Sequence, residues 1–328
     1  MRLSARIIER RLVAPFVTAR GVRRSQRMIR VEIEHQGRAG VGEASGIAYR
    51  GETPEAMLTS IEGFKALIER GISRRELISV MQASGARSAV DAALWDLESR
   101  PERPAFLSIG LKARPEAVVT ATTISLAAPV TMARRTLDVS DRKLLKVKLG
   151  RNDGLDIERA RAVRKAAPEA TLIADGNCGC HAQQLPELAV VLMELDYKLL
   201  EQPLPPGSEE YLRSLNLPIP LCADESLNTR HDIHRLNDVF QYGNIKLDKS
   251  GGLTEALSLA DAMKERGIKR FVGCMLGGTV SIAPAFLLTP DAQFVDLDGP
   301  LWMAEDSPLH RLDEHGRLPA PGPEIWGH

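Results

Sequence analysis

The sequence lacks the cysteine pattern of disulfide-stabilised and zinc-binding proteins. Its four cysteines, Cys178, Cys180, Cys222 and Cys274, fit no disulfide framework, and a chain of 328 residues does not need one. The Cys-Gly-Cys-His stretch also lacks the paired C-x-x-C spacing of a zinc site. We therefore expect reduced thiols that pack as small apolar groups.

An excess of charge of one sign and a long apolar run are also missing. Lys and Arg together number 43, as do Asp and Glu, and this balance does not point to nucleic acid or an anionic membrane as a partner. No apolar run approaches membrane-spanning length, and arginines interrupt the apolar residues near the N-terminus. These absences predict a cytoplasmic protein. Self-association into a homo-oligomer is left open.

What the chain does contain is a repeat of strand-like and helix-like segments. Eight short β-rich runs lie at 117–124, 143–149, 170–177, 197–203, 219–226, 243–252, 269–276 and 292–299. Most are separated by helical patterns, so a parallel sheet is indicated, and eight such units favour a modified (β/α)8 TIM-like barrel in an α/β protein. A doubly wound open sheet is the alternative, but no G-x-G-x-x-G follows the first run.

The residues before the repeat predict a separate α+β domain. Residues 27–45 alternate like antiparallel strands around a Gly-containing turn. A helix is expected after Thr53, with Pro54 at its first position and Gly71 past its end, and a second helix over 86–100. We expect an N-terminal α+β capping domain at 1–115, a barrel at 116–298 and a tail at 299–328 that packs back on the capping domain.

Charged side chains gather where the predicted strands end, which is where (β/α)8 barrels place their chemistry. These residues are Lys146, Lys148, Asp175, Asn177, Glu201, Asp224, Glu225, Lys246, Asp248, Asp296 and Asp298. A strand-end Asp is ordinarily a turn or cap residue. Three consecutive strands that end in carboxylates require a cation between them, and hard oxygen ligands without histidine fit Mg²⁺, with Mn²⁺ as a substitute. The expected ligands are Asp175, Glu201 and Asp224.

The strand at 143–149 raises the question of why two lysines share one face. Leu145, Val147 and Leu149 point one way, and Lys146 and Lys148 point the other. An edge strand with a solvated face is the simpler interpretation. The alternative is a buried site in which desolvation, a second ammonium and a divalent cation lower a lysine pKa enough for it to act as a base. Lys246 then faces the same site from across the barrel.

Five motifs resemble the muconate-lactonizing subgroup of the enolase superfamily over nearly the whole chain. They are KVK at 146–148, DGN at 175–177, EQP at 201–203, ADES at 223–226 and IKLDKSGGLTEAL at 245–257. The resemblance implies an isomerase in which a metal and Lys146 stabilise an enediolate, while Lys148 and Lys246 exchange the α-proton on the (S) and (R) faces. It also implies that Asn177 and Glu225 lie behind the metal ligands and support them.

Within that subgroup, the stretches 273–276 and 296–306 resemble dipeptide epimerases, the L-Ala-D/L-Glu epimerases among them. This resemblance implies that Asp296 and Asp298 hold the ammonium of a dipeptide substrate, and that a capping-domain arginine, Arg23 or Arg24, binds an anionic side chain. The chain departs from the pattern at Cys178 and at residues 277–279. These departures affect the expected identity of the substrate more than the expected type of reaction.

Three alternatives stay open at this point. Racemases of N-acylamino acids, o-succinylbenzoate synthases and cycloisomerases belong to the same superfamily, but their substrates lack the ammonium that Asp296 and Asp298 suit. A Schiff-base aldolase using Lys148 or Lys246 leaves the three carboxylates unexplained. A non-catalytic protein on an enzyme scaffold requires a lost catalytic residue, and none is missing.

Overall fold

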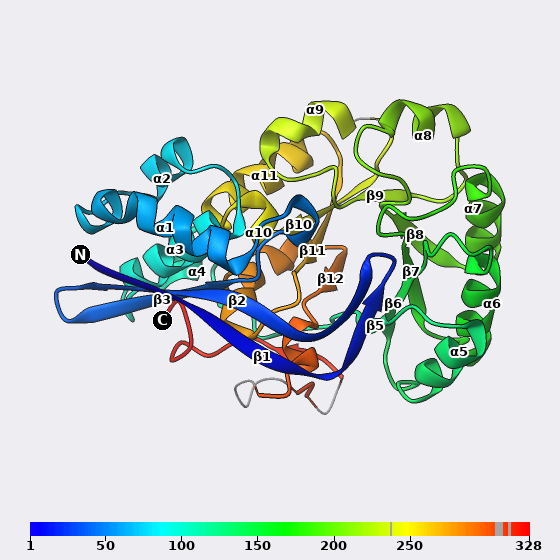
Figure 1. Ribbon diagram of the computed structural model, residues 1–328, viewed down its shortest axis with the longest axis horizontal. Helices are drawn as coiled ribbons and strands as arrows, with labels where there is room; N and C mark the ends of the chain where they lie inside the picture. The colour runs from blue at the N-terminus through cyan, green and yellow to red at the C-terminus, as the bar shows by residue number, and fades with distance from the viewer. Residues whose placement is uncertain (237, 306–310, 314–315) are drawn as a thin grey trace.

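The computed structural model describes residues 1–236, 238–305, 311–313 and 316–328. Its N-terminal part is an antiparallel sheet in the order β1-β2-β3 (Figure 1). The strands are β1 (Arg2–Thr18), β2 (Gly21–His35) and β3 (Arg38–Ala44). The β2–β3 pair turns at residues 36–37, as the alternation over 27–45 predicts. The long β1 strand, by contrast, has no counterpart in the predicted elements.

Five helical segments belong to this part of the chain. They are the 3₁₀ turn η1 (Ala48–Arg50) and the helices α1 (Pro54–Glu69), α2 (Arg74–Val80), α3 (Gly85–Glu98) and α4 (Ala105–Ser108). Among them, α1 and α3 pack against the sheet. The α1 helix begins as predicted, because the Thr53 side chain accepts a hydrogen bond from Ala56 N at 3.2 Å. The α3 helix lies directly on β3: a Cβ atom at Gly40 or Gly42 would stand 2.1 Å from an α3 carbonyl oxygen. Both glycines are therefore needed for this packing.

Eight parallel strands follow and form a nearly closed barrel, which confirms the predicted fold class. They are β5 (Thr122–Ile124), β6 (Leu144–Lys148), β7 (Thr171–Asp175), β8 (Tyr197–Glu201), β9 (Leu221–Ala223), β10 (Tyr242–Lys246), β11 (Lys269–Gly273) and β12 (Phe294–Asp296). Each lies inside one of the eight predicted runs, except that β10 begins one residue before its run. The sheet runs in order from β12 to β5, and Ala121 N donates to Val295 O at 2.8 Å where its two edges meet.

The barrel strands are linked by helices and short turns. The helices are α5 (Pro129–Leu137), α6 (Asp156–Ala166), α7 (Leu185–Glu194), α8 (Glu209–Leu215), α9 (Ile233–Leu236), α10 (Leu247–Ser250), α11 (Leu253–Glu265) and α12 (Thr279–Ile282). The 3₁₀ turns are η2 (Arg230–Asp232), η3 (Ala283–Asp291) and η4 (Gly299–Trp302). Within the described residues, none of the helices has the length and apolarity needed to cross a bilayer.

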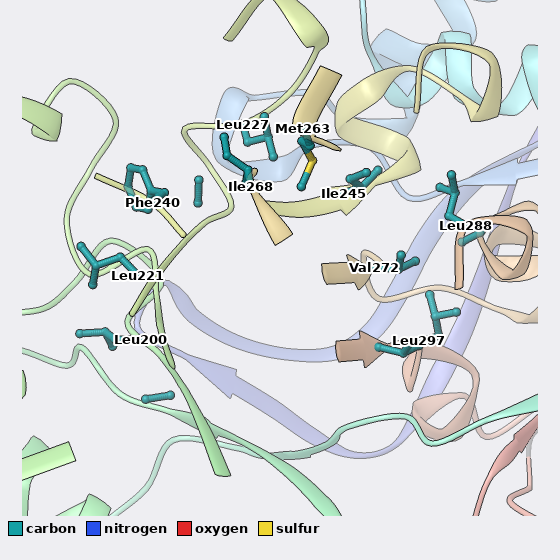
Figure 2. Close-up of a cluster of buried hydrophobic side chains, with 14 of the residues drawn as sticks. Leu200, Leu221, Leu227, Phe240, Ile245, Met263, Ile268, Val272, Leu288 and Leu297 are labelled. Carbon is teal, nitrogen blue, oxygen red and sulfur yellow. The ribbon is translucent and has the colours of Figure 1, made fainter. Parts of the chain in front are cut away.

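Side chains of the barrel strands alternate between two apolar layers. Those that point outward pack against the helices, and Figure 2 shows part of this layer, with Ile245, Val272 and Leu297 among its members. Those that point inward fill the lower barrel with Leu144, Phe271 and their neighbours. β6 follows this alternation, so its two lysines face the upper interior. It lies between β5 and β7, which makes the edge-strand interpretation wrong.

The C-terminal residues contact both earlier parts of the chain. β13 (Leu318–Pro319) pairs with β4 (Ala117–Val118), and Trp326 Nε1 donates to Ala92 O in α3 at 3.0 Å. Residues 306–310 and 314–315 of the predicted tail, including Asp306 of the 296–306 motif, lie outside the described residues. The boundaries 1–115, 116–298 and 299–328 remain a proposal.

Candidate active site

A cavity of about 220 Å³ lies between the carboxyl ends of the barrel strands and the tip of the β1–β2 hairpin. Its barrel side carries Lys146, Lys148, Asp224, Lys246, Asp296 and Asp298. Its capping side carries Arg20, Arg23, Tyr49 and their neighbours. Side chains from both halves of the chain thus surround one space, as expected for a binding site.

The three predicted lysines are buried there and each contacts carboxylates. Lys146 Nζ lies 3.1 Å from Asp175 Oδ2 and 2.8 Å from both Glu201 Oε2 and Asp296 Oδ2. Lys148 Nζ lies 2.7 Å from Asp175 Oδ2. On the opposite wall, Lys246 Nζ lies 2.7 Å from Asp224 Oδ2.

These contacts reverse the expected pKa shift of Lys146. Burial lowers the pKa of the Lys146 ammonium, but Asp296, Glu201 and Asp175 together raise it well above its usual range. The pKa of Lys246 is also raised, since Asp224 outweighs the effect of burial. The prediction of a lowered lysine pKa assumes a divalent cation beside the lysines and stays a prediction. Without a cation, the carboxylates that would hold it pair with the lysines instead.

The three predicted metal ligands end neighbouring strands and are almost completely buried. Asp175 and Glu201 pair in register across β7 and β8, and Asp224 directly follows β9. Burial and the nearby Asp175 raise the pKa of Glu201 to about 7. Glu201 Oε2 and Asp224 Oδ1 accept no hydrogen bond from the described residues, although ammonium groups lie close.

These oxygens test whether the site fits a divalent cation. No three His, Cys, Asp or Glu side chains of the described residues already converge as a metal-binding group, because each carboxylate turns towards a lysine. The donor set nevertheless suits Mg²⁺: its members are carboxylates, they are buried, and two of their oxygens lack hydrogen bonds. A cation between them would also relieve the repulsion that raises the pKa of Glu201.

A second group of side chains holds these carboxylates in place. Asn244 Nδ2 donates to Glu201 Oε1 at 2.8 Å, and Asn177 N donates to Asp175 Oδ1 at 2.8 Å. Lys249 is fully buried, and its Nζ lies 2.6 Å from Asp224 Oδ1. Sequence reasoning missed Asn244 and Lys249, although both lie in the predicted run 243–252, two residues before and three residues after Lys246. Glu225, in turn, pairs with Arg20.

The acidic pair after β12 lies in the same cavity. Asp296 Oδ2 accepts from Lys146, while its buried Oδ1 has no hydrogen-bond donor among the described residues. Asp298 Oδ2 accepts from Thr123 N at 3.0 Å and Trp302 Nε1 at 3.2 Å. Burial and Asp296 raise the pKa of Asp298 to about 6. The pair therefore forms an anionic pocket with spare acceptor capacity.

The structure distinguishes the two candidate arginines. Arg23 pairs with Phe16 in the β1–β2 register, and both line the cavity. Arg24 is exposed, does not line the cavity, and as the next residue of β2 points to the opposite face. Sequence reasoning missed Arg20, which lies in the hairpin turn, stacks over Tyr49 and pairs with Glu225.

Cys178, Cys274 and the departures from the motifs lie at the edge of the site, whereas Cys180 and Cys222 pack in the hydrophobic interior. All four thiols are free, as expected. Cys274 lines the cavity, but burial raises its pKa well above the usual range, so the thiol is a poor nucleophile. Cys178 accepts a weak hydrogen bond from Arg20 at 3.5 Å. Gly277 packs against Ser45 and Ser281.

Two family descriptions match most of the chain. Residues 2–105 match the "Mandelate racemase / muconate lactonizing enzyme, N-terminal domain", and residues 130–321 match "Enolase C-terminal domain-like". Among curated relatives, L-Ala-D/L-Glu epimerase of Escherichia coli K12 is 40% identical over 297 residues, which are 90% of this chain and 92% of that protein. N-acetyl-D-glutamate racemase of a Pseudoalteromonas species is 38% identical over 278 residues, 83% of this chain and 87% of that protein.

Solved structures of related proteins superpose on nearly the full length of this chain. An enolase family member from Agrobacterium tumefaciens, with homology to dipeptide epimerases and with sodium and L-Ala-L-Glu bound, superposes with a TM-score of 0.94 at 38% identity over 99% of both chains. A dipeptide epimerase from Methylococcus capsulatus, complexed with Mg and L-Arg-D-Lys, superposes with a TM-score of 0.85 at 30% identity over 99% of this chain and 97% of the other.

Proposed function

The chain belongs to the mandelate racemase / muconate lactonizing enzyme family of the enolase superfamily, and we propose that it is a dipeptide epimerase specific for L-Ala-D/L-Glu. As an isomerase of amino acid derivatives, it must remove and return one α-proton. The observation that carries the proposal is the placement of Lys148 and Lys246 on opposite walls of one cavity, each beside a different buried carboxylate.

The predicted metal ligands and Lys146 have separate roles in this proposal. Asp175, Glu201 and Asp224 would hold a divalent cation, Mg²⁺ or Mn²⁺, supported by Asn177 and Glu225. When bound, the cation supplies electrostatic stabilisation of the charge that develops on the substrate carboxylate. Lys146, the most buried of the three lysines, donates to the same oxygens. The structure of an Mg complex of a related epimerase agrees with this choice of metal.

The two remaining lysines transfer the proton. β6 and β10 are four strands apart in the eight-stranded order, so Lys148 and Lys246 reach a bound α-carbon from opposite sides. One neutral lysine accepts the proton, and the ammonium on the other side returns one. Once a cation shares Asp175 and Asp224, these carboxylates stabilise the lysine ammonium groups less, so deprotonation becomes easier.

The ends of the cavity select the substrate. Asp296 and Asp298 favour an ammonium group, and Arg23 favours an anionic side chain, so a dipeptide with a free amino terminus and an acidic second residue fits both. An N-acylamino acid racemase is the second candidate, since one such relative is 38% identical. Its acylated substrates lack the positively charged ammonium that would balance the buried Asp296 and Asp298. The dipeptide has this ammonium and is therefore favoured.

Proton NMR in D₂O with Mg²⁺ tests the proposal on L-Ala-L-Glu and L-Ala-D-Glu. Wild type should exchange the α-proton of the Glu residue and interconvert the diastereomers. Lys148→Ala and Lys246→Ala should each stop epimerisation, because turnover needs both groups. Each variant should still exchange the proton of the one diastereomer that faces its remaining lysine: L,L for Lys246→Ala and L,D for Lys148→Ala.

Lys198→Ala is the matched control, because Lys198 is an exposed lysine on β8 outside the cavity. It should behave as wild type. Near wild-type epimerisation by either cavity variant would rule out the two-base mechanism, and absence of exchange in wild type would rule out the dipeptide.

A further inference from the structure

We propose that the Tyr49 hydroxyl contacts the substrate and determines specificity, by donating a hydrogen bond to the side-chain carboxylate of an acidic dipeptide. This inference rests on the proposed function and deepens it. It adds to the predicted Arg23 a second, uncharged donor from a different loop, so that the two donors reach one carboxylate from two directions.

The first observation is a hydroxyl shielded from solvent that has no hydrogen-bond partner among the described residues. A buried hydroxyl without a partner destabilises a fold by roughly 1–3 kcal/mol, so such a group requires an explanation. Tyr49 also lines the cavity. Burial, with Asp224 and Glu225 nearby, raises its pKa well above the usual range, so the hydroxyl keeps its proton and acts as a donor.

The second observation is the charge on the capping side of the cavity. Arg20 is neutralised by Glu225, which is buried below it. Arg23 donates to the amide oxygen of Gln26 at 3.0 Å and has no carboxylate partner among the described residues. The other lining residues of this side carry no negative charge: Phe16, Thr18, Gly21, Val22, Gly46 and Ala48. Donors thus exceed acceptors here, and an anionic group would satisfy them.

The third observation is that the ring of Tyr49 is held in place. The Arg20 guanidinium stacks over it, 4.6 Å from its centroid. The loop that carries it is fixed to the barrel, because Asp248 Oδ1 accepts from Ser45 N at 2.8 Å and Gly46 N at 2.9 Å. A fixed donor loses little entropy when it binds its acceptor, so it suits recognition.

The test compares L-Ala-L-Glu with L-Ala-L-Met, an unbranched substrate of similar length that lacks the carboxylate. Tyr49→Phe removes only the hydroxyl. We expect KM for L-Ala-L-Glu to rise about 10-fold to 100-fold, as for the loss of a hydrogen bond to a charged group, with kcat little changed. Values for L-Ala-L-Met should stay within about twofold, as should both substrates with the exposed-residue control Tyr211→Phe.

Two results would overturn the inference: unchanged kinetics with both substrates, or an equal loss with both, which would place the hydroxyl at the part that the two substrates share. Calorimetric binding of the two dipeptides to wild type and Tyr49→Phe, with Mg²⁺ present, repeats the comparison without turnover. If wild type turns over neither dipeptide, the proposed function fails, and selective loss of L-Ala-L-Glu binding still decides the role of Tyr49.

Discussion

Lys146 and Lys249 are both completely buried, yet their surroundings shift their pKa values in opposite directions. Burial lowers both. Lys146 faces three carboxylates, which raise its pKa well above the usual range. Lys249 contacts one carboxylate, that of Asp224, and donates to the carbonyl oxygens of Leu227 and Asn244, so its pKa stays lowered. The number of anionic neighbours, rather than depth, therefore decides the chemistry of each lysine.

Replacing Asp298 by Asn tests the ammonium pocket. The amide oxygen of Asn can still accept from Thr123 and Trp302, so the fold should persist while the negative charge is lost. We expect KM for L-Ala-L-Glu to rise about 10-fold or more, and KM for its N-acetyl derivative to change little. Steady-state kinetics on the two substrates measures this, and an equal effect on both would assign Asp298 a structural role.

The residues of the site could be predicted from sequence to different extents. Lys146, Lys148, Asp175 and Glu201 end strands of clear alternation, so their convergence follows from the barrel geometry alone. Arg23 could not be separated from Arg24 until the register of the hairpin fixed which face each occupies. The sequence around Tyr49 did not indicate a functional residue, because the exposure of its hydroxyl to the cavity depends on the conformation of the surrounding loop.

At the scale of elements, the barrel strands were predictable and β1 was not. Barrel strands read as short apolar runs between turns. β1 carries arginines along its length, and their charges are balanced only by residues distant in sequence, such as Glu34 for Arg2 and Glu43 for Arg10. These ion pairs can be recognised only when β1, β2 and β3 are assembled into the sheet. The short α2 helix was missed as well, although Ser73 and Glu76 form a capping box at its start.

The contact between α3 and α11 predicts a pH dependence of stability. Asp91 of α3 accepts hydrogen bonds from Thr254 N and Oγ1 at the start of α11, but burial raises its pKa to about 6. The folded state therefore holds this proton more tightly than the unfolded chain, and ionisation destabilises the fold as pH rises. This loss of folding stability is absent below about pH 4 and reaches about 3 kcal/mol above pH 6.

Asp91→Asn should remove this penalty. We expect the free energy of unfolding of the variant, relative to wild type, to rise between pH 4 and pH 7 in urea titrations at constant ionic strength. The exposed Asp138→Asn variant serves as the control and should follow wild type over the same range. A parallel dependence in Asp91→Asn and wild type would show that Asp91 does not titrate in this window.

At the scale of the whole molecule, a cation should link activity to stability. EDTA should abolish epimerisation and Mg²⁺ or Mn²⁺ should restore it, since the proposed reaction needs a cation on Asp175, Glu201 and Asp224 to stabilise the negative charge that develops on the substrate. Mg²⁺ at about one hundred times its Kd should also stabilise the fold by about 2.7 kcal/mol. Thermal unfolding with increasing Mg²⁺ measures this without substrate, and Glu201→Gln should weaken the response. Full activity in metal-free protein would refute the assignment.

The cavity is bounded by two parts of the chain that are far apart in sequence, and this separation has an evolutionary consequence. The proposed chemistry resides in strand ends of the barrel, whereas Val22 and Arg23 of β2 and Ala48 and Tyr49 of η1 line the capping side of the cavity, where we propose that the side chain of the substrate binds. Mutations there can alter which peptide is accepted while the proton-transferring groups stay intact. Saturation libraries restricted to these positions would therefore sample new substrates at little risk to catalytic competence.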